Sequence, residues 1–161
     1  MLIDVPQDKS YALLTGGPTV FVTSRSPEGR DSTKNILASG EFGISVPGTS
    51  LRKGLVASGS IHAREITEDK FAYAKLDKLS ARVIKAPLVK GALAHLECRI
   101  VDHDLFARTG IAIADVVSAQ VEADYWDGES IICEGRPEQT LHSASAGTYF
   151  PRGHVQSWYL P

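Results

Sequence analysis

The sequence is poor in the residues and patterns that mark metal centres and membrane proteins. Its only two cysteines, Cys98 and Cys133, lie far apart and fit no metal-binding spacing. Both lie in apolar stretches, which is typical of buried, reduced thiols. No apolar run approaches the length of a membrane span or of a signal-peptide core. We therefore expect a protein of the reducing cytoplasm, without a metal site.

Net charge is also nearly absent. The chain has 17 Lys and Arg against 19 Asp and Glu, a net charge of −2, which predicts neither a nucleic-acid nor a membrane surface. The hydrophobic fraction of 43% and the charged fraction of 22% are ordinary for a globular protein. With 161 residues the chain can bury a full core, so we expect a single domain spanning 1–161.

Several catalytic signatures are missing as well. The sequence contains no GxGxxG, Walker loop, HExxH, GxSxG or CxxC pattern. His95 and Glu97 share one face of a predicted strand, but two ligands do not make a metal site, and a polar outer face is the favoured interpretation. Asp102-His103-Asp104 is expected to be a solvated loop at a strand end. No catalytic side chain is assigned.

The first half of the chain alternates short strands and helices. Residues 19–23 form a β-rich run, and a Pro-Gly turn is expected at 26–29. A helix is predicted from Ser32 or Thr33 through Ala38, with Gly40 just after its end. Residues 41–46 then alternate as a strand with one apolar face. Ser50 and Thr67 are the expected caps of two further short helices.

The second half is predominantly β. Residues 92–100 predict a strand with Leu96 on its apolar face and Glu97 on the opposite face. Residues 111–125 predict a second long strand, with 104–110 as the reversal between the two, and Asp127-Gly128 predicts a tight hairpin. Long strands that meet through hairpins favour a mainly β, antiparallel barrel with short peripheral helices over a parallel sheet.

Two polar segments suggest a binding site. Thr23-Ser24-Arg25 ends the first strand, and Thr33-Lys34-Asn35 begins the first helix. A helix N-terminus offers unpaired N–H groups and the positive end of a dipole, which suits phosphate, and Lys34 adds a full charge. If the fold joins the two ends, they form a phosphate pocket. Ordinary strand-end and N-cap chemistry is the alternative.

A series of segments, in order, resembles the flavin reductase-like, FMN-binding split-barrel family, which includes flavoredoxin-like proteins. The segments are PTVFVTSR, EGR, TKNILASGEFGISV, DKFAYAKL, APLVKGALAHLECRIVD, GIAIADVVSAQVE and RPEQTLHSASAGTYF. The resemblance implies a six-stranded antiparallel Greek-key split barrel with peripheral helices. It also implies a homodimer with FMN, or alternatively FAD, near the subunit interface.

The resemblance also assigns cofactor-binding residues. Thr23, Ser24 and Arg25 match the strand end beneath the flavin, and Ser32, Thr33, Lys34 and Asn35 match the segment near its phosphate and ribityl chain. Ser58 and His62 match the edge of the cofactor, and Tyr149 belongs to a C-terminal motif. His142 belongs to the same C-terminal motif. Arg25, Lys34 and His62 are the candidates for stabilising a reduced flavin anion.

Three functions remain open. The first is NAD(P)H-dependent reduction of FMN or FAD, with NAD(P)H as co-substrate and hydride transfer to the flavin ring. The second is an FMN-binding electron-transfer protein without its own NAD(P)H activity, which passes electrons to a redox partner. The third is a barrel that binds no flavin and serves as an interaction module. Flavin titration separates the third from the others.

One departure from the family lies at the junction of Ser32 and Thr33. The family normally has two more strands and a loop there, about 25–30 residues by ordinary element lengths. Either the protein lost this hairpin or the sequence omits a segment of it. We favour the omission, because deletion of two barrel strands would open sheet edges. Intact mass tests this, since an untagged protein near 17.4 kDa would exclude it.

Overall fold

The structure is a computed structural model, and it describes residues 1–15, 17–25, 32–61, 65, 69–145 and 148–151. Its strands are β1 (Leu2–Asp4), β2 (Phe21–Thr23), β3 (Glu41–Val46), β4 (Lys78–Leu79), β5 (Leu88–Val89), β6 (Ala94–Ile100), β7 (Ala114–Glu122), β8 (Leu141–Ser145) and β9 (Thr148–Pro151). Its helices are η1 (Gln7–Leu14), α1 (Ser32–Ser39), η2 (Thr49–Leu51), α2 (Arg52–Gly59), α3 (Lys70–Tyr73), α4 (His103–Thr109) and η4 (Ala123–Tyr125).

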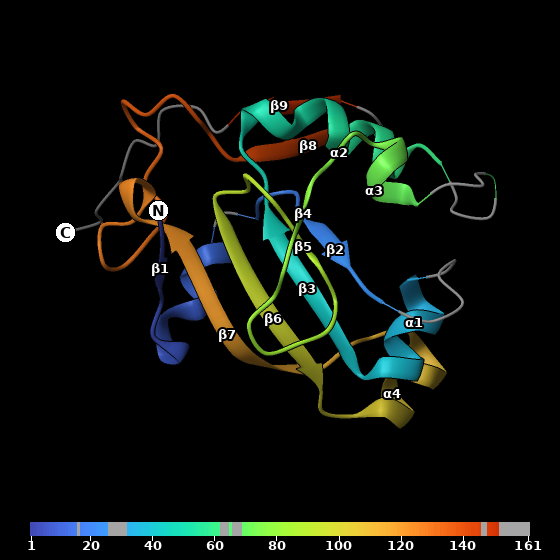
Figure 1. The fold of residues 1–161 in the computed structure, drawn as a ribbon. Helices are drawn as coiled ribbons and strands as arrows, with labels where there is room; N and C mark the ends of the chain where they lie inside the picture. Colours follow the sequence, from blue (N-terminus) through green and yellow to red (C-terminus); the bar gives the residue numbers. More distant parts are fainter. Residues whose placement is uncertain (16, 26–31, 62–64, 66–68, 146–147, 152–161) are drawn as a thin grey trace.

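Five strands form the main sheet, in the order β1-β7-β6-β3-β2, and every neighbouring pair is antiparallel. Two small sheets, β4-β5 and β8-β9, flank it (Figure 1). This confirms the expected mainly β, antiparallel fold with short helices. Among the described residues the main sheet has five strands, where the resemblance implied a barrel of six.

One face of the sheet builds the main core. Leu96 and Cys98 of β6 pack there with Phe42 and Val46 of β3, and all four are less than 9% exposed. Val121 of β7 joins them and is fully buried. The alternation read from the sequence therefore placed the apolar faces of β3 and β6 correctly, because burial of one face requires a period of two. In β7 a register shift opposite Glu97 and Cys98 places Val116, rather than Val117, against the core with Ala119 and Val121.

The opposite face of the sheet is polar, yet it is also buried. Ser45, His95 and Gln120 lie side by side across β3, β6 and β7, and each is at most 5% exposed. Residues 80–87, here called the strap, link β4 to β5 and cross in front of β6 and β3 (Figure 1). Glu97, expected on a polar outer face, is 1% exposed because the strap covers it.

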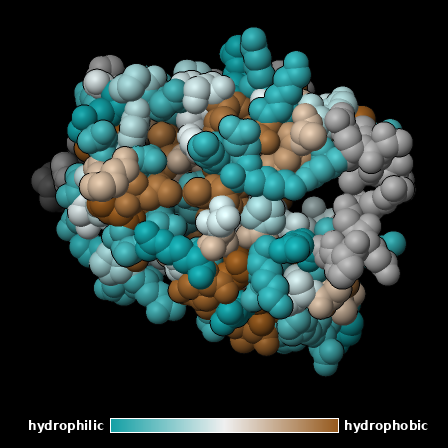
Figure 2. All heavy atoms as spheres, viewed as in Figure 1, coloured by the Kyte–Doolittle hydropathy of each residue, from teal (hydrophilic) through white to brown (hydrophobic). Residues whose placement is uncertain are grey.

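The strap side of the molecule is chemically mixed. Figure 2 shows hydrophilic side chains interleaved with separate hydrophobic patches on this face. Within the strap, Ile84 and Ala86 are 6% and 2% exposed, whereas Val83 is 44% exposed. Alternate strap residues therefore turn toward the sheet and contribute apolar contacts beside the polar ones.

Helix α1 follows its sequence signals. It spans Ser32–Ser39 where a helix through Ala38 was expected, and Gly40 follows with a φ of 69°. The Gly40 N–H donates to the Ile36 carbonyl at 2.7 Å, which closes the helix C-terminus in the expected manner. The Ser32–Thr33 junction lies inside the first turn of α1. The omission of a segment there stays a prediction.

The expected reversal at 104–110 is instead a helix. Asp102 caps α4, with its Oδ1 accepting from the Leu105 N–H at 2.8 Å. Gly110 ends the helix at a φ of 74°, and Phe106 is buried in the core. The cap and the terminal glycine were both visible in the sequence, but the Asp-His-Asp run was interpreted as a solvated loop.

The cap expected from Ser50 was wrong. Thr49 Oγ1 and the Ser50 N–H both donate to Glu138 Oε2, each at 2.9 Å, and the helical region opens as η2 before α2. A carboxylate distant in sequence thus supplies the acceptor. Thr67, the other expected cap, lies outside the described residues, and α3 begins after Asp69, whose Oδ1 accepts from the Phe71 N–H at 3.0 Å.

Candidate functional site

The two polar segments picked out in the sequence meet in the fold. Asn35 of α1 donates its side-chain amide to Ser24 Oγ, just beyond β2, at 3.3 Å. Asn35 is 8% exposed, and Ser24 is half-buried. The hydrogen bond therefore ties the end of β2 to the first half of α1, as the phosphate-pocket hypothesis requires.

Thr23 forms the inner wall of this region. It is 8% exposed, and its Oγ1 donates to the Gly43 carbonyl of β3 at 3.3 Å. A Cβ added to Gly43 would lie 2.6 Å from Thr23 Oγ1 and 2.7 Å from Leu88 Cδ2. Strands β2, β3 and β5 thus approach one another at a point where only glycine fits.

The rim of the region is exposed and basic. Arg25 follows Ser24, and Ser32, Thr33 and Lys34 lie in the first turn of α1; all four are exposed. Lys34 therefore adds positive charge to the positive end of a helix dipole, and Arg25 follows the residue that Asn35 contacts, an arrangement that attracts anions. Of the remaining predicted site residues, Ser58 and Tyr149 lie elsewhere.

Ser58 and Tyr149 belong to a second region, around the start of β2. Ser58 Oγ donates to the Leu55 carbonyl within α2 at 3.0 Å. Tyr149, half-buried on β9, packs against a cluster that contains Leu55 and Phe21. His62 lies outside the described residues. His142, on β8, has its Nε2 3.2 Å from Thr140 Oγ1.

The sequence missed the most fully buried polar groups. Glu97 Oε1 accepts from the Arg82 N–H at 2.9 Å, and its Oε2 accepts from the N–H groups of Val83 and Ile84 at 2.7 and 3.0 Å. The alternation of β6 showed which way Glu97 points. No local signal showed that a loop would cover it.

His95 lies next to Glu97 on the same face. Its Nδ1 is 3.0 Å from Ser45 Oγ, which also accepts from the Val89 N–H at 3.1 Å. Burial lowers the pKa of His95 to about 4, although Glu122 and Glu97 act in the opposite direction. His95 is therefore neutral at pH 7 and serves as a hydrogen-bonding part of the sheet.

The two cysteines are buried in the core. Cys98 and Cys133 are both free and buried, and burial raises the pKa of the Cys98 thiol to about 11. Within the part of the chain that the structure describes, no three His, Cys, Asp or Glu side chains gather as metal ligands. In that same part, no helix is long and apolar enough to cross a membrane.

Comparison with solved structures places the fold. An FMN-binding domain of a flavin reductases-like enzyme from Shewanella baltica OS155 superposes with a TM-score of 0.89 at 20% identity, covering 99% of this chain and 98% of that one. Flavoredoxin of Desulfovibrio vulgaris (Miyazaki F) gives 0.69 at 15%, covering 88% and 89%. A flavin reductase with split barrel domain from Shewanella frigidimarina NCIMB 400 gives 0.67 at 16%, covering 99% and 75%.

These likenesses, at low identity, establish the split-barrel fold. A search of curated proteins finds no match. The model of the flavin reductase like domain matches residues 10–140, which is most of the chain and includes both polar segments of the site. The chain therefore belongs to the flavin reductase-like domain family.

Proposed function

We propose that this protein binds FMN where the end of β2 meets the first turn of α1, and that it reduces the bound flavin with NAD(P)H. The observation that carries the proposal is the Ser24–Asn35 hydrogen bond, which joins the two segments within a chain of the flavin reductase-like family. FAD is the alternative flavin.

The donor set around this junction fits a flavin phosphate. Hydroxyls of Ser24, Ser32 and Thr33 are hydrogen-bond donors, and Arg25 and Lys34 supply positive charge at the N-terminus of α1. Asn35 has its amide directed at Ser24, so it orients that hydroxyl. Thr23 is turned inward to Gly43 and forms the wall behind.

Bound flavin would supply the redox chemistry, accepting a hydride from the nicotinamide. The protein's own residues bind and orient. Arg25 and Lys34 hold negative charge at the rim, and His62 remains a candidate for the edge of the ring. Tyr149, packed on Leu55 and Phe21, would close the side of the pocket formed by α2 and β8-β9.

A second candidate function is electron transfer without NAD(P)H activity. The similarity to flavoredoxin, at a TM-score of 0.69, favours it. In this alternative the flavin stays tightly bound and passes electrons to a redox protein partner. A homodimer in the cytoplasm, with flavin near the subunit interface, is part of both proposals, and light scattering of the purified protein would test the dimer.

The first experiment is an absorbance titration of the purified protein with FMN, followed by NADH and NADPH oxidation. Binding together with FMN-dependent oxidation supports the reductase. Binding without oxidation supports the electron carrier. Absence of FMN and FAD binding contradicts both and leaves a barrel that serves as an interaction module.

A charge variant locates the site. Lys34→Ala should weaken FMN binding about tenfold, because a charge-assisted contact to phosphate contributes roughly 1.5–3 kcal/mol. The matched control is Lys9→Ala, on η1, whose Nζ donates to the Gly128 carbonyl at 3.0 Å. Equal FMN affinities for the two variants would contradict placement of the phosphate at α1.

A further inference from the structure

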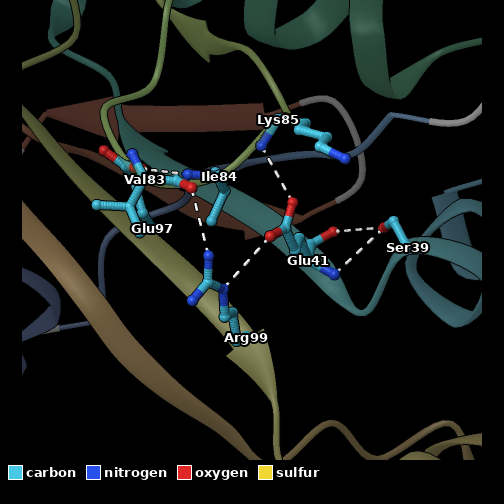
Figure 3. A network of polar contacts seen from close by, with 7 residues as sticks. All are labelled: Ser39, Glu41, Val83, Ile84, Lys85, Glu97 and Arg99. Carbon is cyan, nitrogen blue, oxygen red and sulfur yellow. Dashed lines mark hydrogen bonds and ion pairs between the residues drawn. The ribbon is translucent and has the colours of Figure 1, made fainter.

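The strap is held by carboxylates along four consecutive residues. The N–H groups of Arg82, Val83 and Ile84 donate to Glu97, and the Lys85 N–H donates to Glu41 Oε2 at 3.1 Å. Figure 3 shows both glutamates reaching the strap from neighbouring strands, Glu97 from β6 and Glu41 from β3. Successive N–H groups of this kind form a concavity suited to an anion, and here side chains of the sheet fill it.

Arg99 adds a positively charged contact between Glu41 and the strap. Arg99 Nε donates to Glu41 Oε1 at 3.3 Å, and Arg99 Nη2 donates to the Val83 carbonyl at 3.4 Å (Figure 3). Arg99 is half exposed, whereas Glu97 is 1% exposed. Hydrogen bonds to buried charged groups are the stronger ones, so Glu97 dominates the attachment of the strap.

The far end of the strap reaches the proposed flavin site. Pro87 and Leu88 follow the held residues 82–85 after Ala86. Both approach Gly43: a Cβ on Gly43 would lie 3.4 Å from the Pro87 carbonyl and 2.7 Å from Leu88 Cδ2. The Val89 N–H then donates to Ser45 Oγ at 3.1 Å. The strap is thus held by Glu97 and Glu41 along its length, and β5, which follows it, is held to β3 beside Gly43.

We infer that Glu97 is a positioning residue for the flavin site: by fixing the strap, it sets where Pro87 and Leu88 lie against Gly43, the residue whose carbonyl accepts from Thr23. This inference rests on the proposed function. The strap transmits the constraint because its alternate side chains, Ile84 and Ala86, are packed on the sheet and leave it little freedom.

The test compares three variants. Glu97→Gln keeps the side-chain volume but replaces one acceptor oxygen by an amide that faces N–H donors. Glu41→Gln makes the milder change at the Lys85 end. Asp127→Asn is the matched control, because Asp127 Oδ1 accepts from two backbone N–H groups, of Glu129 and Ser130, in a turn beyond β7.

FMN affinity and the visible circular dichroism of bound FMN are measured at a temperature where each flavin-free variant is fully folded by far-ultraviolet circular dichroism. Glu97→Gln should weaken FMN binding about tenfold, and Glu41→Gln about threefold, since tenfold corresponds to 1.4 kcal/mol. The dichroism of bound flavin should change in Glu97→Gln. Asp127→Asn should bind FMN as the unaltered protein does.

The outcomes separate the two proposals. If the unaltered protein does not bind FMN, the proposed function fails. If it binds FMN and Glu97→Gln matches Asp127→Asn in affinity and dichroism, the positioning role is overturned alone. If Glu97→Gln does not fold, Glu41→Gln decides, and normal affinity and dichroism in that variant overturn the inference.

Discussion

The two faces of the central strand β6 are both buried, but by different physics. Leu96 and Cys98 lie in the hydrophobic core, whereas His95 and Glu97 lie under the strap and are satisfied by hydrogen bonds. Burial of apolar area stabilises the first face without directional demands. The second face is stable only while every polar group keeps its partner, so it specifies one path of the chain across the sheet.

The largest expected losses of stability come from two separate substitutions at neighbouring positions of β6, one on each face. Glu97→Ala should lower the free energy of unfolding by about 3–5 kcal/mol, because it leaves three N–H groups without an acceptor, each costing roughly 1–3 kcal/mol where buried. Leu96→Ala should cost about 2–5 kcal/mol through the cavity it creates. Urea denaturation measures both. A cost below about 1 kcal/mol for Glu97→Ala would show that water replaces the carboxylate and that the polar face is not specific.

Of the two faces of β6, only the polar one should lose stability as the pH falls from 7.5 to 4.5, because it carries His95. The pKa of His95 is about 4 in the folded protein and 6.5 in the unfolded chain. The unfolded state therefore binds the proton first as pH falls. The stability due to neutral His95 is fully present above pH 6.5 and is lost between pH 6.5 and 4, by about 3 kcal/mol.

The matched control for acid is His95→Gln, which cannot titrate in this window. Urea midpoints of the two proteins, measured from pH 7.5 to 4.5, should converge as pH falls, because only the unaltered protein loses the contribution of His95. Parallel curves would mean that the protein accommodates a protonated His95 beneath the strap.

The smallest expected effect concerns the point where the covered face meets the proposed site. Gly43→Ala places a methyl group 2.6 Å from Thr23 Oγ1 and 2.7 Å from Leu88 Cδ2, and should cost about 1–3 kcal/mol through overpacking. Gly59→Ala in α2 meets nothing within 4 Å and should be neutral or slightly stabilising. Thermal unfolding compares them, and equal melting temperatures would show that the Leu88 side chain of β5 moves aside.

Local signals in the sequence predicted the strands β2, β3, β6 and β7 and the helix α1, but not the short strands β1, β4, β5, β8 and β9. The helix end at Gly40 and the alternation of β3 and β6 were found because a terminal glycine and a period of two act over a few residues. The helix at 103–109 was missed although Asp102 and Gly110 mark its ends. Burial of Phe106 in the core stabilises that short helix, and the neighbouring residues alone do not predict that Phe106 is buried.

The candidate site divides in the same way. The hydroxyls and cations at 23–25 and 32–35 were recognised from residue type and family resemblance. That Asn35 reaches Ser24, while Thr23 turns inward to Gly43, depends on how β2, β3 and α1 pack. Ser58 and Tyr149 were grouped with them in sequence, yet they contact the cluster at the opposite end of β2.

The sequence by itself determined the family, the antiparallel arrangement of the long strands and the faces of β3 and β6 that enter the core, because these follow from short-range periodicity and from segments in order. Only the tertiary structure decided that the polar face is buried. Glu97 is separated from the strap residues that it binds by 13–15 positions, and Ser45 is separated from His95 by 50. Hydrogen bonds between such distant residues form only after the strands have paired, so no local pattern encodes them.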